Sequence, residues 1–356
     1  MLRRVRLARQ LKFHQAILEA TDQCLSADPK VYLMGLGAPD PKGIFGTTLG
    51  LGTKYGGRRV MDMPASENAM TGIAIGSALT GMRPIMTHQR VDFALLALDQ
   101  LINNAAKWRY MFGGRMKVPL VVRLIMGRGW GQGPQHSQSL ESIFAHIPGL
   151  KVVMPSTPHD AKGLLIAAVE DDNPVIFLEH RWLHGTFGQV PQPPYRVRIG
   201  KARTARPGRD VTIAAASYAT LEALHAAKIL AEQKISAEVI DMRSLRPLDA
   251  PHLLASVRKT GRLIAIDNGW RAFGFAAEIV ALASEAAFHE LKCPPRRISP
   301  PETPTPTSWA LSNRYYPGVK NIVDEALSML GRPKRRWPRQ NHIPQDKPDP
   351  SFTGPF

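Results

Sequence analysis

Short apolar segments, typical of buried β-strands, alternate in the first half of the chain with longer segments whose apolar residues recur at a helical period. The expected strands are residues 31–34, 84–87, 120–125, 151–154 and 174–179, and the expected helices are residues 13–25, 68–79, 92–110 and 161–170. Such alternation is typical of βαβ units, whose crossovers place successive strands in one largely parallel sheet. The first half is therefore predicted to be an α/β domain.

The composition changes after residue 185, where prolines and glycines become frequent. Proline lacks an amide donor and fixes its backbone angle, so we expect this stretch to be a linker. A second alternating series follows, with strands expected at 210–215, 237–241 and 262–266, and helices at 221–233, 250–258, 274–283 and 319–330. The sequence therefore predicts two doubly wound α/β domains.

Five segments are expected along the chain. They are a basic segment with a helix at 1–30, the first domain at 31–185, the linker at 186–209, the second domain at 210–330 and a tail at 331–356. The tail is basic and rich in proline, with few large apolar residues. Because it can bury little apolar surface, we expect it to be disordered.

The net charge of +17 is concentrated near the two ends of the chain. Residues 1–12 contain five basic side chains and residues 331–340 contain five more, in both cases without an acidic residue. Charge placed in this way favours solvated tails, or a contact for an acidic partner subunit, over specific recognition of nucleic acid. A nucleic-acid-binding function would depend on net charge alone.

The two cysteines, Cys24 and Cys293, lie far apart in the sequence and form neither a disulfide framework nor a CxxC metal motif. We expect buried thiols in a reducing compartment and assign the cytoplasm. The arginine-rich start is short and lacks serine, unlike a typical transit peptide. Because no segment approaches the roughly 18 apolar residues of a membrane helix, no membrane span is expected.

A first candidate site is the segment Pro64-Ala65-Ser66-Glu67-Asn68, between an expected strand and an expected helix. A carboxylate at this point lies where open α/β sheets bind ligands, beyond the carboxyl end of a strand. The alternative is structural, since Ser66 could cap the helix and Glu67 would interact favourably with the helix dipole. The spacing alone leaves both interpretations open.

A second candidate site is the glycine-rich segment 126–139, MGRGWGQGPQHSQS, which contains His136. It suits a substrate loop carrying a general acid, or else a structural turn with a surface histidine. Neither the GK[ST] of a phosphate-binding loop nor the GxGxxG spacing of a dinucleotide-binding turn is present. Four further histidines show no metal-ligand spacing and are interpreted as packed or surface residues: His88, His146, His180 and His184.

Several long segments resemble the beta subunits of thiamine-diphosphate-dependent 2-oxo-acid dehydrogenases. They are RRVMDMPASENAMTGIAIGSALTGMRPI (58–85), DFALLALDQLINNAAKWRYMFGG (92–114), GPQHSQSLESIFAHIPGLKVVMPSTPHDAKGLL (133–165), DDNPVIFLEHRWLHG (171–185) and VIDMRSLRPLDAPHLLASVRKTGRLIAID (239–267). The resemblance covers roughly residues 13–330. It implies a thiamine-diphosphate pyrimidine-binding domain followed by a transketolase C-terminal-type domain, in an α2β2 assembly that decarboxylates a 2-oxo acid and passes the acyl group to a lipoyl acyltransferase.

The resemblance also implies roles for individual residues. Glu67 matches the glutamate that bonds N1′ of the cofactor's aminopyrimidine, where sharing a proton favours the imino tautomer that activates the cofactor. Phe93 matches an aromatic residue that packs on the pyrimidine, and Gln89 lies near the same pocket. His136 matches a histidine that contacts the substrate. Backbone groups near three residues match a monovalent-cation site, for K⁺ in some members: Ala168, Asp171 and Asn173.

The diphosphate anchor of such enzymes is missing here. The GDG motif that holds Mg²⁺ and the diphosphate does not occur in the chain, so a partner alpha subunit is expected to supply it. Two further departures are Leu36-Gly37, where many members have an acidic pair, and Asp267-Asn268, where members have His-Glu. A non-catalytic scaffold subunit and half of a transketolase-like ketol transferase therefore stay open as alternatives.

Overall fold

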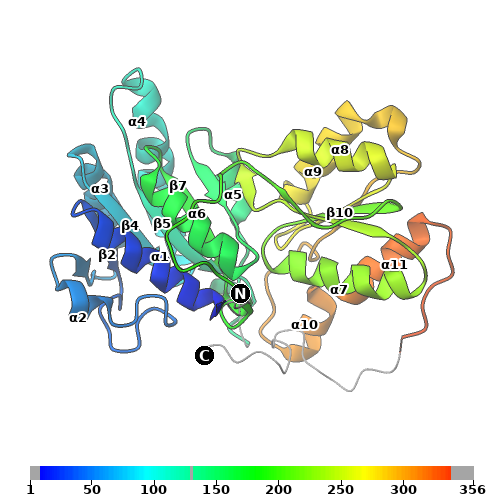
Figure 1. The fold of residues 1–356 in the computed structure, drawn as a ribbon, viewed down its shortest axis with the longest axis horizontal. Coiled ribbons are helices and arrows are strands. Elements are labelled where there is room, and N and C mark those ends of the chain that lie inside the picture. Colours follow the sequence, from blue (N-terminus) through cyan, green and yellow to red (C-terminus); the bar gives the residue numbers. More distant parts are fainter. Residues whose placement is uncertain (1–8, 129–130, 338–356) are drawn as a thin grey trace, which may run out of the picture.

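The computed structural model describes residues 9–128 and 131–337. Two α/β domains lie side by side, the first at the left of Figure 1 and the second at the right. The sheet of the first domain has the strand order β12-β6-β7-β5-β4-β2-β3. Its parallel strands are β2 (Val31–Gly35), β3 (Val60–Met61), β4 (Arg83–His88), β5 (Val121–Met126), β6 (Lys151–Val153) and β7 (Val175–His180).

Successive residues of these strands pack on opposite faces of the sheet, as a pleated strand requires. Val121 and Phe177 contact the cluster formed with α1 (Phe13–Ala27) and α6 (Pro158–Glu170). Val122 and Ile176 contact the other cluster, which includes α3 (Glu67–Leu79). Because both faces are covered, most residues of these strands are apolar, which made them recognisable in the sequence.

The second domain contains a five-stranded sheet with the order β14-β13-β10-β11-β9. The strands are β9 (Arg203–Arg206), β10 (Val211–Ala215), β11 (Ala237–Asp241), β13 (Leu263–Ile266) and β14 (Arg296–Ile298), of which β9 is antiparallel to its neighbour. One face packs on α7 (Tyr218–Glu232) and α11 (Val319–Met329), and the other on α8 (Ala250–Thr260) and α9 (Phe275–Ala286). This arrangement confirms the predicted class of two α/β domains.

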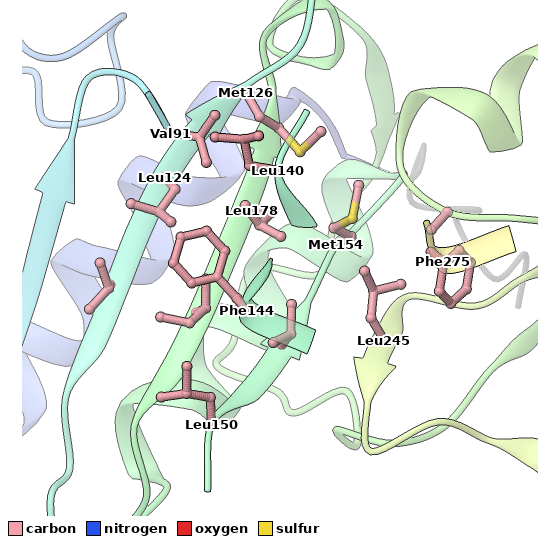
Figure 2. Packing of buried hydrophobic residues seen from close by; sticks show 14 of the residues in the cluster. Val91, Leu124, Met126, Leu140, Phe144, Leu150, Met154, Leu178, Leu245 and Phe275 are labelled. Atoms are coloured by element: carbon pink, nitrogen blue, oxygen red, sulfur yellow. The ribbon is translucent and has the colours of Figure 1, made fainter. Parts of the chain in front are cut away.

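The two domains share a strand and a core. Strand β12 (Ser244–Arg246), which follows β11 of the second domain, pairs antiparallel with β6 at the edge of the first sheet. One hydrophobic cluster extends from Phe144 and Leu178 in the first domain to Leu245 and Phe275 in the second (Figure 2). The domains are therefore packed as one unit rather than joined only by a flexible linker.

The structure differs from the sequence expectations in three places. The expected linker, 186–209, contains β9 and also β8 (Phe187–Gln189), which pairs with β1 (Gln10–Lys12). The expected helix 92–110 is a 3₁₀ segment η1 (Phe93–Ala97), a π segment η2 (Gln100–Ala105) and α4 (Ala106–Met111). Its buried residues, Ala94, Ala97, Leu101 and Ala105, still recur at the three- and four-residue spacing of an α-helix, which is why the sequence predicts one continuous helix.

The third difference lies in the tail. The Trp337 side chain packs against the core of the second domain, and its Nε1 donates to Asp324 Oδ1 at 2.9 Å. Arg335 forms a salt bridge with Glu232 at 3.0 Å. The start of the expected disordered tail is therefore in contact with the domain, and residues 338–356 lie outside the described part of the chain. In the described ranges, every helix is too short or too polar to cross a lipid bilayer.

If the shared core joins the domains, Leu245→Ala should destabilise both of them together. The Leu245 side chain is 6% exposed within the cluster, so its truncation should lower the free energy of unfolding by about 2–5 kcal/mol. Chemical denaturation, followed separately at Trp182 and at Trp270 in variants that retain only that one of the six tryptophans, should show both signals at a lower midpoint. A shift of the Trp270 signal alone would contradict the shared core, and Leu311→Ala, at an exposed position, is the control.

Candidate active site

Glu67 is the first residue of α3, just beyond the carboxyl end of β3. The carbonyl of Ser66 accepts from Met70 N at 3.0 Å and starts the helix, but the Ser66 side chain caps no amide. The Glu67 carboxylate is half-buried and forms no hydrogen bond or ion pair with the residues that the structure describes. At the N-terminus of α3 the carboxylate interacts favourably with the helix dipole, and its oxygen atoms remain available to a ligand.

Phe93 and His136 come into contact although they are 43 residues apart. The two rings meet edge to face, with 5.3 Å between their centroids. Phe93 opens η1, which packs against α3, and its amide donates to the carbonyl of Arg90 at 3.2 Å. His136 follows the 3₁₀ turn η3 (Gly133–Gln135). The structure therefore brings together the aromatic residue and the histidine that the sequence singled out.

Two hydrogen bonds connect the segments that follow β4, β2 and β3, and Gln89 makes one of them. Its Nε2 donates to the carbonyl of Leu36 at 2.9 Å, and the next amide, of Gly37, donates to Asp62 Oδ1 at 2.8 Å. Gly37 has a φ of +74°, a conformation that favours glycine. Where related chains carry an acidic pair, this chain therefore has a turn whose amide is bound by a carboxylate from another loop. Sequence reasoning missed Asp62, which lies five residues before Glu67.

The second domain holds the beginning of the glycine-rich loop. Arg128 Nη2 donates to Glu222 at 3.2 Å and to the carbonyl of Pro317 at 3.1 Å. Its guanidinium also lies over the rings of Trp182 and Tyr218, at 5.0 and 5.4 Å. These contacts span both domains, so the position of the His136 loop depends on how the domains pack.

Two glycines let the loop pass close to its neighbours. A Cβ on Gly127 would lie 2.3 Å from His180 Nε2, and one on Gly133 would lie 2.4 Å from Thr307 Oγ1. Both glycines have positive φ values. Burial, together with the charge of Arg128, lowers the pKa of His180 well below its ordinary value, so this imidazole is a neutral packing partner.

The far end of the loop leads to a buried pair of carboxyl groups, Glu141 in the first domain and Asp267 in the second. The two carboxyl groups influence each other's pKa, and Asp267 accepts from Ala276 N at 2.8 Å and Gly269 N at 3.1 Å. Burial, and next the Asp267 charge, raise the pKa of Glu141 well above its usual range. We infer that Glu141 is protonated and donates to Asp267 across the domain boundary.

The residues expected near a monovalent cation lie at the opposite edge of the sheet, before β7 begins. Ala168 O accepts from Asp171 N at 3.3 Å, and Asp171 Oδ1 accepts from the backbone and side-chain nitrogens of Asn173 at 2.9 and 2.7 Å. Arg83 already donates to the carbonyl of Asp171 at 3.2 Å. This turn therefore lies at the amino ends of the strands, remote from their carboxyl ends, where Glu67 lies.

The other histidines serve the interior in different ways. Burial lowers the pKa of His88 to about 4. His184 Nε2 lies 3.2 Å from Glu179, whose carboxylate also binds Arg123 at 2.6 Å. Both Arg123 and Glu179 are fully buried, and the signal for this pair was present in the sequence as single charges inside apolar strands. In the described part of the chain, no group of three or more metal-ligating side chains is assembled.

Comparison with known domain families gives the class of the protein. Residues 9–185 match the "Transketolase, pyrimidine binding domain" and residues 200–322 match the "Transketolase, C-terminal domain". A solved "split gene transketolase, inactive beta4 tetramer" superimposes with a TM-score of 0.72 over 91% of this chain and 99% of that one, at 22% sequence identity. This second likeness shows the fold alone.

The relatives define the family more closely. The beta subunit of acetoin:2,6-dichlorophenolindophenol oxidoreductase from Cupriavidus necator is 44% identical, over 91% of this chain and 98% of the relative. The mitochondrial pyruvate dehydrogenase E1 component subunit beta-2 from Oryza sativa subsp. japonica is 42% identical, over 90% of this chain and 86% of the relative. The chain belongs to the family of beta subunits of thiamine-diphosphate-dependent 2-oxo-acid dehydrogenases.

The buried carboxyl pair predicts a stability that falls as the pH rises. Above the unfolded-state pKa of about 4.3, the unfolded chain releases the Glu141 proton while the folded chain keeps it, so the free energy of unfolding decreases up to the raised folded pKa. Glu141→Gln keeps the donor and cannot ionise. At pH 8 we expect it to be more stable than the wild type, and this gain should vanish near pH 4.

Denaturant titrations across this pH range provide the measurement. Glu238→Gln is the matched control, because burial raises the pKa of Glu238 but Lys259 and Ser256 overcome it and leave this pKa below its ordinary value. Its removal should therefore destabilise the protein at pH 8. A Glu141→Gln variant that loses stability at pH 8 would show that the Glu141 side chain is ionised in the folded protein.

Proposed function

We propose that this chain supplies Glu67 and His136 to an active site that an alpha subunit completes. The observation that carries the proposal is the uncommitted Glu67 carboxylate at the carboxyl ends of the sheet, on a helix that packs against the segment opened by Phe93. Phe93 in turn contacts His136. These groups fit the aminopyrimidine of thiamine diphosphate, which needs a carboxylate at one edge and an apolar surface against its face.

In this proposal, each residue has one role. Thiamine diphosphate, when bound, would supply a nucleophilic carbon and an acceptor for the electron pair released as a 2-oxo acid loses CO₂. Glu67 holds a proton at N1′, which an amide could not exchange. Phe93 packs against the pyrimidine ring, Gln89 borders the same pocket, and His136 donates or accepts a proton at the substrate oxygen.

The alpha partner is supported by the surface of α3. Ala69, Ile73 and Gly76 are exposed along one side of this helix, and Ile73 is 57% exposed. A Cβ on Gly76 would meet no atom within 4 Å, so the glycine serves no packing inside this chain. A stripe of small and apolar residues allows another helix to approach closely.

The remaining components follow from what the chain does and does not carry. Its sequence has no GDG motif, so we assign Mg²⁺ and the diphosphate to the alpha subunit, in an α2β2 assembly that passes its acyl group to a lipoyl acyltransferase. A K⁺ ion near Ala168, Asp171 and Asn173 would have a structural role. Two free cysteines are consistent with a reducing compartment, and we propose the cytoplasm.

Glu67→Gln tests the proposed proton transfer. The amide is nearly isosteric, so folding and assembly should be unchanged, whereas hydrogen–deuterium exchange at the cofactor's C2 should slow by about 10²–10⁴-fold in the complex with the alpha subunit. Glu285→Gln, at an exposed position of α9, should exchange at the wild-type rate. If C2 exchanged at the wild-type rate in a fully assembled Glu67→Gln complex, Glu67 would have only the structural role of starting α3.

The isolated chain should bind thiamine diphosphate weakly, because it lacks the groups that neutralise the diphosphate. Calorimetry with Mg²⁺ present should give no micromolar binding until the alpha subunit is added. Tight binding by this chain alone would place the whole cofactor site within it.

Ile73→Asp should block assembly without unfolding the chain. The side chain is mostly exposed in the single chain, but in the proposed interface its charge would be buried without a partner. We expect at least ~30-fold weaker association with the alpha subunit by sedimentation, the equivalent of about 2 kcal/mol, with an unchanged melting temperature. Ile73→Val is the control, and normal assembly of Ile73→Asp would place the interface elsewhere.

A further inference from the structure

Two buried arginines converge on one acceptor beside the candidate active site. Arg90 follows β4 and Arg181 follows β7, and both are less than a tenth exposed. Arg90 Nη2 lies 3.0 Å from Gln132 Oε1, and Arg181 Nη1 lies 2.6 Å from the same oxygen. A neutral amide oxygen is therefore held between two positive charges.

The ring of Phe45 supports both guanidinium groups. The Cζ atoms of Arg90 and Arg181 lie 5.0 and 4.9 Å from its centroid. Phe45 adopts a φ of +49°, a conformation that is strained for a residue with a Cβ. The backbone of Phe45 is thus held in an unfavourable conformation, and its ring attracts both cations through its π face.

The two guanidinium charges lie close enough to affect each other. Burial, and then the charge of Arg90, lower the pKa of Arg181 to about 9. The Nε of Arg90 is buried without a hydrogen-bond partner in the described part of the chain. The charge of Asp92 acts on Arg90, but its Oδ1 accepts from Gln138 at 2.7 Å, and no salt bridge joins Asp92 to Arg90 in the described part of the chain.

The pair adjoins the residues proposed for catalysis. The carbonyl of Arg90 accepts from the amide of Phe93, and Gln132 lies four residues before His136 in the same loop. Gln132 is exposed and stands between Gly131 and Gly133, both with positive φ. Its side chain can therefore leave the arginines without disturbing a packed element.

We propose that Arg90 and Arg181 bind a second, distal carboxylate of a 2-oxo acid substrate, and that Gln132 Oε1 occupies the position of one carboxylate oxygen until the substrate arrives. This inference rests on the proposed function and deepens it, because it selects 2-oxo dicarboxylic acids over alkyl 2-oxo acids. Exchanging a neutral amide oxygen for a carboxylate gives charge-assisted, fork-shaped hydrogen bonds to both guanidinium groups.

The carboxylate bound here must be the one that the substrate keeps. The C1 carboxylate becomes neutral CO₂ as the carbon–carbon bond breaks, and its electron pair goes to the cofactor. A strong ion pair with C1 would be lost in the transition state and would raise the barrier. A distal carboxylate keeps its charge throughout, so the arginine pair binds substrate and transition state equally and determines specificity.

Binding can be measured on the full chain by calorimetry, with glutarate as the probe and pentanoate as the matched acid with one carboxylate. We expect glutarate to bind and pentanoate to bind at least ~30-fold more weakly, as for truncating one partner of a buried charge pair. Arg181→Gln should abolish this difference, and Arg181→Lys should retain part of it. Arg115→Gln, at an exposed position, is the control.

A second variant protects the test if Arg181→Gln does not fold. Gln132→Glu places a carboxylate of the chain itself between the arginines and should weaken glutarate binding by about 30-fold through competition for the same charges. Gln135→Glu adds the same charge at an exposed position three residues later and should bind as the wild type. Absence of glutarate binding, or equal binding by both charge variants, would overturn the inference.

Turnover by the complex with the alpha subunit separates this inference from the proposed function. The ratio of kcat/KM for 2-oxopentanedioate to that for 2-oxopentanoate should be high and should fall about 10²-fold in Arg181→Gln. A wild-type preference for the alkyl acid would refute the inference and leave the proposed function intact. Glutarate binding without turnover of any 2-oxo acid would refute the proposed function while the carboxylate site stands.

Discussion

Strand β12 leaves the second domain, pairs with β6 in the first, and brings Leu245 into the core that both domains share. The geometry of the candidate site depends on this packing. The His136 loop belongs to the first domain, but Arg128 at its beginning is bound by Glu222 and Pro317 of the second. At its end, Glu141 and Asp267 meet across the same boundary. Both ends of the glycine-rich segment are therefore tied to the domain interface.

The charged groups of the candidate site are of two kinds: those paired within the chain and those left available to a ligand. Most charged groups near it are paired inside the chain, as Arg123 is with Glu179. The half-buried Glu67 carboxylate differs, since it meets no partner among the described residues and stands at the start of α3. Burying a charge is costly unless the charge is paired. A half-buried carboxylate without a partner in the chain is therefore expected where another molecule supplies the partner.

Departures from the family pattern have local structural explanations. The turn at Leu36-Gly37 has no carboxylate of its own, but Gly37 N is bound by Asp62. Asp267 caps the start of α9 through Ala276 N, and Asn268 Nδ2 donates to the carbonyl of Ala216 at 3.3 Å. These substitutions thus build contacts within the chain, and none of them removes Glu67 or His136. They give little support to a purely scaffolding subunit.

The long apolar strands and the helices with a clear period could be predicted from the sequence, because burial on both sheet faces leaves a continuous apolar run such as 120–125. Short strands such as β8 and β12 could not, since three residues carry no period and their partners are distant in sequence. Glu67 and His136 could be singled out from their places in the sequence, and the resemblance supplied their roles. The convergence of Arg90, Arg181 and Gln132 follows from tertiary structure, and its only signal was an arginine just beyond each of two strands.

The most direct measurement of the central claim is an experimental structure of the complex between this chain and its alpha subunit with thiamine diphosphate bound. The account predicts that a Glu67 carboxylate oxygen lies about 2.6–3.0 Å from N1′ of the aminopyrimidine, as in a hydrogen bond that shares a proton. It also predicts that Phe93 contacts the pyrimidine and that the diphosphate is held by the partner. A cofactor bound elsewhere, or an N1′ more than about 4 Å from the Glu67 carboxylate, too far for any hydrogen bond, would contradict the account.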